Sequence, residues 1–62
     1  MKFTGYIDGE KVTFALDDAG RLIVTHADGS EEQYNEEYYT EDSYFTIRDM
    51  LNRDGVRNLM DA

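Results

Sequence analysis

The fold is decided by residues 2–16, which read KFTGYIDGEKVTFAL. Apolar and polar side chains alternate on both sides of Asp8-Gly9, a dipeptide that is typical of the two-residue turn of a β-hairpin. With this dipeptide as the loop, Phe3 lies opposite Phe14. The turn and the alternation therefore predict the same register, which gathers the apolar side chains on one face. The residues of that face are Phe3, Ile7, Val12, Phe14 and Leu16.

A third strand is expected after residues 17–20, DDAG, which have the composition of a turn. A three-residue loop in this turn places Leu22 opposite Leu16 and Val24 opposite Phe14. The third strand then adds its apolar residues to the face that the hairpin has begun.

Two conformations are possible for residues 31–35. Asp28-Gly29 is another turn signal, and a fourth strand with a very acidic outer face can follow it at the edge of the sheet. Residues 30–33, SEEQ, also match the capping box that begins many helices, so a short helix is the alternative. We favour the strand. In both conformations the glutamates face water, because burying unpaired carboxylates is costly.

A C-terminal helix is expected from about Glu41 to Arg53, with Thr40 as its N-cap and Gly55 as its terminator. The apolar residues between these limits follow helical spacing. One further amphipathic turn is expected to close the edge of the sheet with Val56, Leu59 and Met60. The predicted class is therefore α+β, a three- to four-stranded antiparallel β-meander with a C-terminal α-helix packed on one face.

The size and composition of the chain set further limits. Its 62 residues have room for one domain, residues 1–62. There is no cysteine for a disulfide or a thiolate metal site, and the single His26 cannot build a zinc cluster alone. No apolar run approaches the roughly 20 residues of a membrane span, and the first residues do not resemble a signal peptide. We expect a soluble cytoplasmic protein without cofactor, metal or membrane partner.

Negative charge is concentrated in residues 28–42, DGSEEQYNEEYYTED. The formal net charge is −8, and this stretch holds seven of the fourteen carboxylates, with no Lys or Arg from Ala27 to Ile47. A surface that only confers solubility normally mixes both signs. We therefore interpret the stretch as a partner-binding surface rather than ordinary solvated surface. Its candidate residues are Asp28, Glu31, Glu32, Tyr34, Glu36, Glu37, Tyr38, Tyr39, Glu41 and Asp42.

Catalysis and metal binding have less support in the sequence. Paired carboxylates act as acid and base when burial separates their pKa values, and a domain of this size has little interior. No nucleophile lies beside a base, and His26 is expected at an exposed strand end. The glycine of Asp28-Gly29-Ser30 is in the second position, whereas an EF-hand loop needs it in the sixth. We expect no catalytic residue and no dedicated metal site.

Rows of carboxylates can imitate the phosphates of DNA. Side chains on one face of a strand repeat at about 6.5–7 Å, and phosphates follow each DNA strand at about 3.4 Å of axial rise. A Lys/Arg-lined cleft built for DNA can therefore accept such a row, and tyrosines beside the acids can anchor the contact.

In size, charge, lack of cysteine and the segment EEQYNEEYYTED (residues 31–42), the chain resembles small phage-encoded inhibitors of host defence. Anti-CRISPR proteins come first, followed by phage inhibitors of restriction enzymes or of uracil-DNA glycosylase. The resemblance implies a non-enzymatic DNA mimic in the cytoplasm of a bacterial host, which blocks the Lys/Arg-rich DNA-binding site of a CRISPR effector complex. It implies a basic DNA-binding protein as partner, no direct contact with nucleic acid, and a monomer or weak homodimer.

The rival interpretation is a small structural or interaction module. Such a module would form a homodimer through its second sheet face or its last helix. The residues available for this contact are Ala15, Ile23, Val56 and Met60.

Overall fold

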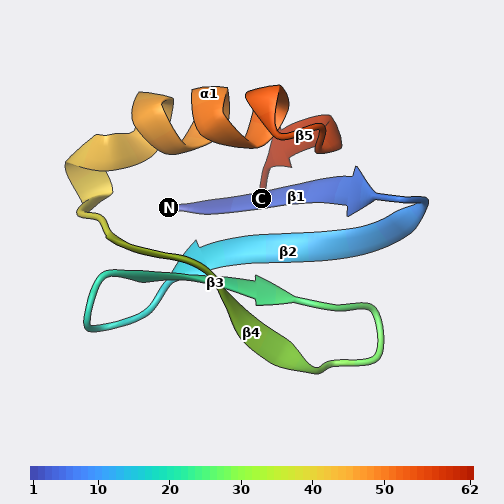
Figure 1. The fold of residues 1–62 in the computed structure, drawn as a ribbon, viewed down its shortest axis with the longest axis horizontal. Helices are drawn as coiled ribbons and strands as arrows, with labels where there is room; N and C mark the ends of the chain where they lie inside the picture. Colours follow the sequence, from blue (N-terminus) through green and yellow to red (C-terminus); the bar gives the residue numbers. More distant parts are fainter.

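The structure, a computed structural model, covers residues 1–62 and contains one antiparallel five-stranded sheet with a helix over one face (Figure 1). Its elements are β1 (Lys2–Ile7), β2 (Glu10–Leu16), β3 (Arg21–Thr25), β4 (Glu31–Tyr38), a 3₁₀ turn (Glu41–Ser43), α1 (Tyr44–Arg53) and β5 (Arg57–Asp61). The strand order is β4-β3-β2-β1-β5. The predicted α+β class, with a meander and a C-terminal helix, is confirmed, and β5 extends the sheet to five strands.

The hairpins have the register that their turns predict. Phe3 pairs with Phe14, and Phe14 pairs in turn with Val24. The first loop consists of Asp8 and Gly9, whose φ angles are 49° and 83°. Positive φ at both positions is what the tightest hairpin turn requires, so Asp8-Gly9 fixes both the turn and the alignment of the strands.

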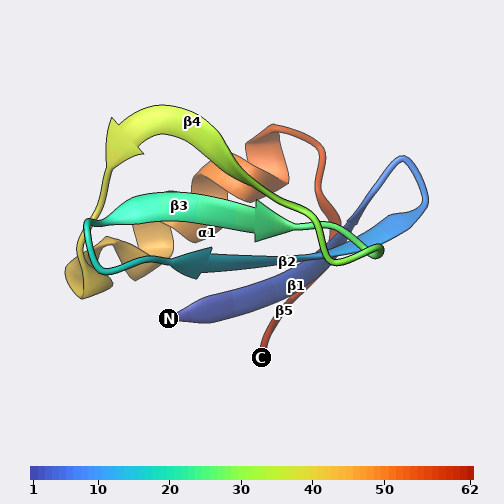
Figure 2. The ribbon, with the colours of Figure 1, turned by 90° about the horizontal axis from the view of Figure 1, so that it is seen from below.

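The core lies between α1 and the apolar face of the sheet (Figure 2). Ile47 and Leu51, one helical turn apart, are both 0% exposed. The buried cluster has eight members: Phe3, Val12, Phe14, Leu22, Val24, Ile47, Leu51 and Val56. No polar or charged residue is buried, so all the charge of the chain remains at the surface.

A capping box precedes α1, at the residue predicted to be its N-cap. The side chain of Thr40 accepts the backbone N–H of Asp42 at 3.3 Å, and the hydroxyl of Ser43 accepts the backbone N–H of Thr40 at 3.2 Å. The first three residues of the predicted helix, Glu41–Ser43, form a 3₁₀ turn, so the α-helix itself begins at Tyr44. Gly55, the residue predicted to end the helix, has a φ of 95°, a positive value that glycine adopts readily.

Residues 31–35, for which a strand and a short helix were both possible, belong to the strand β4. Ile23 pairs with Gln33, and Arg21 pairs with Tyr38. Between these two pairs the chain moves by two residues in β3 but by five residues in β4. The extra residues form a bulge, and Figure 2 shows β4 arching away from β3. A bulged and charged edge strand is poorly suited to pairing with the sheet of another chain.

The final amphipathic turn predicted between Val56 and Met60 is wrong, because this segment continues into β5. It does close the sheet edge, but as a strand antiparallel to β1, with Phe3 paired to Asp61. Strand pairing satisfies the backbone groups along β1 that a helical turn would leave unpaired. Gly5 permits the close approach, since a Cβ there would lie 2.5 Å from Cγ1 of Val56.

We expect Gly5→Ala to lower the free energy of unfolding by about 1–3 kcal/mol, because the added methyl group overlaps Val56 and forces β5 or the core to move. Urea denaturation followed by circular dichroism measures the effect. Thr4→Ala is the control on the other face of the same strand, with an expected change of about 1 kcal/mol or less. Wild-type stability in Gly5→Ala would contradict the packing of β5 against β1.

Candidate functional site

The predicted binding stretch follows one edge of the molecule. It runs from the β3–β4 turn along β4, the edge strand, to the 3₁₀ turn before α1 (Figure 1). The two ends of β4, Glu31 and Tyr38, pair with Thr25 and Arg21, which are four residues apart in β3, so β4 spans roughly 13 Å. The longest dimension of the molecule is 28 Å. We define the acidic strip as the carboxylates of Asp28, Glu31, Glu32, Glu36, Glu37, Glu41 and Asp42.

No Lys or Arg neutralises the acidic strip. The two arginine salt bridges join Arg21 to Asp17 at 2.7 Å and Arg48 to Asp49 at 3.3 Å. Both acceptor carboxylates lie outside the strip. The strip therefore keeps the single sign of charge that its sequence has.

The members of the strip differ in how far they are engaged by the protein itself. Asp28 accepts the hydroxyl of Ser30 at 2.7 Å and its backbone N–H at 2.9 Å, and these bonds lower the pKa of Asp28. Glu41 binds the terminal amine at 2.7 Å, and Glu32 contacts His26. The members without a side-chain partner are Glu31, Glu36, Glu37 and Asp42.

Of the three tyrosines predicted in the stretch, only Tyr38 is freely exposed, at 66%. The ring of Tyr34 meets Phe14 edge to face at 5.5 Å, and its hydroxyl donates to Asp54 at 2.8 Å. Tyr39 is half-buried and packs against the core. Tyr34 and Tyr39 thus attach the strand to the core and to the end of α1, which leaves Tyr38 as the anchor available to a partner.

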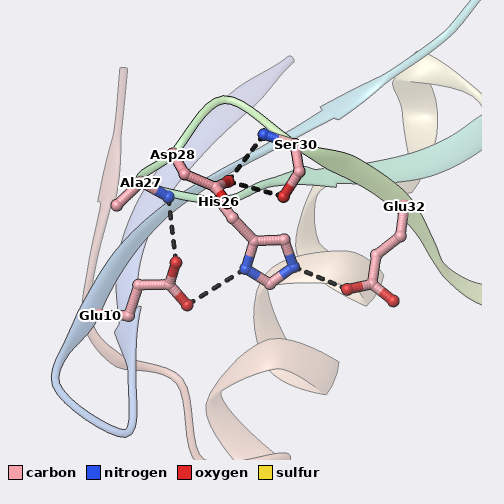
Figure 3. Close-up of polar contacts among 6 residues, drawn as sticks. All are labelled: Glu10, His26, Ala27, Asp28, Ser30 and Glu32. Carbon is pink, nitrogen blue, oxygen red and sulfur yellow. Dashed lines mark hydrogen bonds and ion pairs between the residues drawn. The ribbon is translucent and has the colours of Figure 1, made fainter.

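His26 is half-buried between two carboxylates rather than exposed at a strand end (Figure 3). Its Nδ1 lies 3.1 Å from Oε1 of Glu10, and its Nε2 lies 2.6 Å from Oε2 of Glu32. Glu10 also accepts the backbone N–H of Ala27 through Oε2 at 3.0 Å. The cluster joins the start of β2, the end of β3 and the start of β4, and the sequence had not pointed to it.

Both contacts of the ring favour the imidazolium form. The hydrogen bond with Glu32, followed by the one with Glu10, raises the pKa of His26 above its ordinary value. The backbone N–H of Ala27, with help from His26, lowers the pKa of Glu10. With the ring protonated, the two carboxylates and the imidazolium together carry one negative charge.

The second face of the sheet is covered by no helix (Figure 1). Ala15 and Ile23 line a shallow hollow of about 200 Å³ on this face. Met60, which is 65% exposed, lines a wider hollow of about 410 Å³ beside β5. Val56, expected to join them in a dimer contact, is 5% exposed and belongs to the core, so it is excluded from that surface.

Two further features limit the chemistry of the molecule. No group of three or more His, Asp or Glu side chains is arranged to hold a metal ion. None of the helices has the length and apolar character needed to cross a membrane. Charge and exposed surface are therefore the features from which a function can be argued.

We expect Tyr34→Phe to lower the free energy of unfolding by about 1 kcal/mol, because it removes the hydroxyl that joins β4 to Asp54. Burial and the Asp54 carboxylate raise the pKa of Tyr34 from 10.0 to about 12. The stabilisation linked to this proton is complete below pH 10 and is lost as the pH rises toward 12.

Denaturation and an alkaline titration of phenolate absorbance measure these effects, with Tyr38→Phe as the exposed control. The latest-titrating tyrosine should disappear in Tyr34→Phe and persist in Tyr38→Phe. Equal stability and equal titration of the two variants would contradict the role of Tyr34 in holding β4.

Comparisons of the chain with protein-family models, with curated protein sequences and with solved structures give no match. The geometry of the acidic strip, its one-signed charge and its exposed tyrosine are therefore the basis for any statement about function.

Proposed function

We propose that the protein is a non-enzymatic inhibitor whose acidic strip occupies a Lys/Arg-rich DNA-binding site of another protein and competes there with DNA. The observation that supports this function is a set of four unpartnered carboxylates along the same edge as the exposed Tyr38, with no Lys or Arg bound to the strip. A CRISPR effector complex in the cytoplasm of a bacterial host is the first candidate partner. A restriction enzyme and uracil-DNA glycosylase are the next.

The charge density of the strip is of the order needed to imitate a DNA strand. Seven carboxylates less two that contact cations, Glu32 and Glu41, leave five. Five charges over the 28 Å length of the molecule give one per 5.6 Å, counted over both faces of the edge. Neighbours along β4 alternate between these faces: Glu31 lines the hollow on the uncovered face, and Glu32 lines the hollow beside Val24 and His26. A DNA strand has about one phosphate per 3.4 Å of axial rise, so the strip offers more than half of that density.

The shape of β4 suits contact through side chains. Glu36 and Glu37 lie in its bulge and are exposed to water. Tyr34 fixes the strand through the hydrogen bond of its hydroxyl with Asp54. A basic groove would meet these carboxylates first by long-range attraction and then close around Tyr38. Association by this route is fast at low salt and weakens as salt screens the charges over about 8–10 Å.

We expect the double reversal Glu36→Lys with Glu37→Lys to weaken binding at least about tenfold while leaving the fold intact. Both side chains are exposed and unpartnered, so their loss removes attraction without removing a structural contact. The control is Asp18→Lys with Asp49→Lys, which changes the net charge equally but lies outside the strip. It removes one exposed contact, that of Asp49 with Arg48 at 3.3 Å, and an exposed pair of this kind contributes little to stability.

The measurement is the binding of target DNA by purified CRISPR effector complexes in the presence of the wild-type protein or either variant, at low and high salt. The proposal expects wild type and control to displace DNA at low salt and the strip variant to fail. Loss of inhibition in both variants would show that net charge alone acts, and unaffected DNA binding by every effector would contradict the choice of partner.

Self-association through the uncovered sheet face is the second candidate function. It is favoured by the exposure of Met60 and by the half-buried Ala15 and Ile23 on a face that nothing covers. Sedimentation equilibrium separates the two functions. A dimer that is insensitive to salt, from a protein that does not bind basic DNA-binding proteins, would favour this second function.

A further inference from the structure

We propose that His26 is a pH-dependent gate on the acidic strip: the protonated ring holds Glu32 against the protein, and the neutral ring releases it to a cationic partner. The inference rests on the function proposed above, since it concerns the regulation of the same strip. It begins from the position of the ring between two carboxylates on different strands (Figure 3).

The geometry fits only one protonation state of the ring. An ionised carboxylate only accepts hydrogen bonds, and a neutral imidazole has a single N–H. Both ring nitrogens lie within hydrogen-bond distance of a carboxylate oxygen, 3.1 Å for Glu10 and 2.6 Å for Glu32. When the ring loses a proton, one nitrogen presents a lone pair to a carboxylate, and that contact becomes repulsive.

The contact with Glu32 is the one that breaks. Glu10 is fixed independently, because its other oxygen accepts the backbone N–H of Ala27 at 3.0 Å. Glu32 has no partner apart from His26, and its side chain is 65% exposed. The remaining proton therefore stays on Nδ1, which faces Glu10, and Glu32 turns to solvent.

The charged groups around the ring all act in the same direction. Glu10 faces it from β2, Glu32 faces it from β4, and Asp28 acts on it from the β3–β4 turn. A hollow of about 230 Å³ beside the ring is lined otherwise by uncharged residues: Ile7, Val24, Gln33 and Tyr34. No Lys or Arg opposes protonation, and partial burial of the ring is the one opposing influence.

Stability and binding then depend on pH in opposite ways. The pKa of His26 in the folded protein is raised above 6.5. The stabilisation from its contacts with Glu10 and Glu32 is therefore complete below pH 6.5 and is lost as the pH rises through this raised pKa. Over the same interval the charge of the cluster changes from −1 to −2. The strip gains a free carboxylate, so its affinity for a cationic groove rises.

The first test needs no partner. An NMR titration from about pH 5.5 to about pH 9 follows the His26 ring and the side-chain carboxylates of Glu32 and Glu10, a range that covers the ordinary histidine value. We expect Glu32 to shift with the same midpoint as His26, that midpoint to lie above 6.5, and Glu32→Gln to lower it. A Glu32 signal that does not follow His26 would overturn the gate.

The second test uses an oligoarginine peptide as the cationic probe. Between about pH 6 and about pH 9, we expect the affinity of the wild-type protein to rise about three- to tenfold, because one carboxylate is freed and one positive charge is lost. His26→Gln should lose this rise, and Glu32→Gln should keep only the smaller part that comes from the lost positive charge of His26. Both variants retain the contact between the terminal amine and Glu41, so they correct for any contribution that it makes.

The two tests separate the gate from the proposed function. Equal peptide affinity of the wild-type protein at both pH values would overturn the gate and leave the function standing. No binding of the peptide at either pH would contradict the function, and the NMR titration would still decide whether His26 controls Glu32.

Discussion

The burial of one apolar sheet face beneath a ten-residue helix is the constraint on which the rest of the structure depends. Ile47 and Leu51 close the core, and of the nine buried residues eight are apolar and the ninth is Gly5. A chain of this size has no second core, so it cannot compensate for a buried charge. All fourteen carboxylates must therefore lie at the surface, where their mutual repulsion acts against the compact state.

The edge strand β4 carries a large share of these carboxylates, and its exposed position lets water screen their repulsion. Tyr34 in β4 and Tyr39 just after it pack against the core, while Glu31, Glu36 and Glu37 are exposed to water. A straight, apolar edge would invite pairing with another sheet, and the bulge and glutamates of β4 prevent it. The same features leave Glu36 and Glu37 free for a partner. Protection of the edge and presentation of charge are thus two effects of one strand.

The sequence predicted the parts of this fold that local signals determine. Asp8-Gly9 fixed the first hairpin because its turn geometry and the alternation of apolar residues require the same register. β5 was missed because the apolar residues from Val56 to Met60 fit a helical turn as well as a strand, and its pairing with β1 joins opposite ends of the chain. The strip's lack of Lys or Arg partners followed from composition; its division into engaged and free carboxylates required the fold.

His26 shows why register matters for a site as well as for a fold. In the observed register Glu32 pairs with Val24, two residues before His26, so the two side chains lie diagonally on the same face. While residues 31–35 could also be helical, nothing in the sequence placed Glu32 beside the ring. The contact between His26 and Glu32 stabilises the fold, and it occupies a carboxylate that a cationic partner would also bind. A partner's guanidinium at Glu32 would replace the contact that the neutral ring gives up, so the complex would regain attraction that the free protein loses at high pH. This exchange makes the end of β4 next to the β3–β4 turn the part of the strip most sensitive to pH, whereas the bulge has no titrating neighbour of this kind.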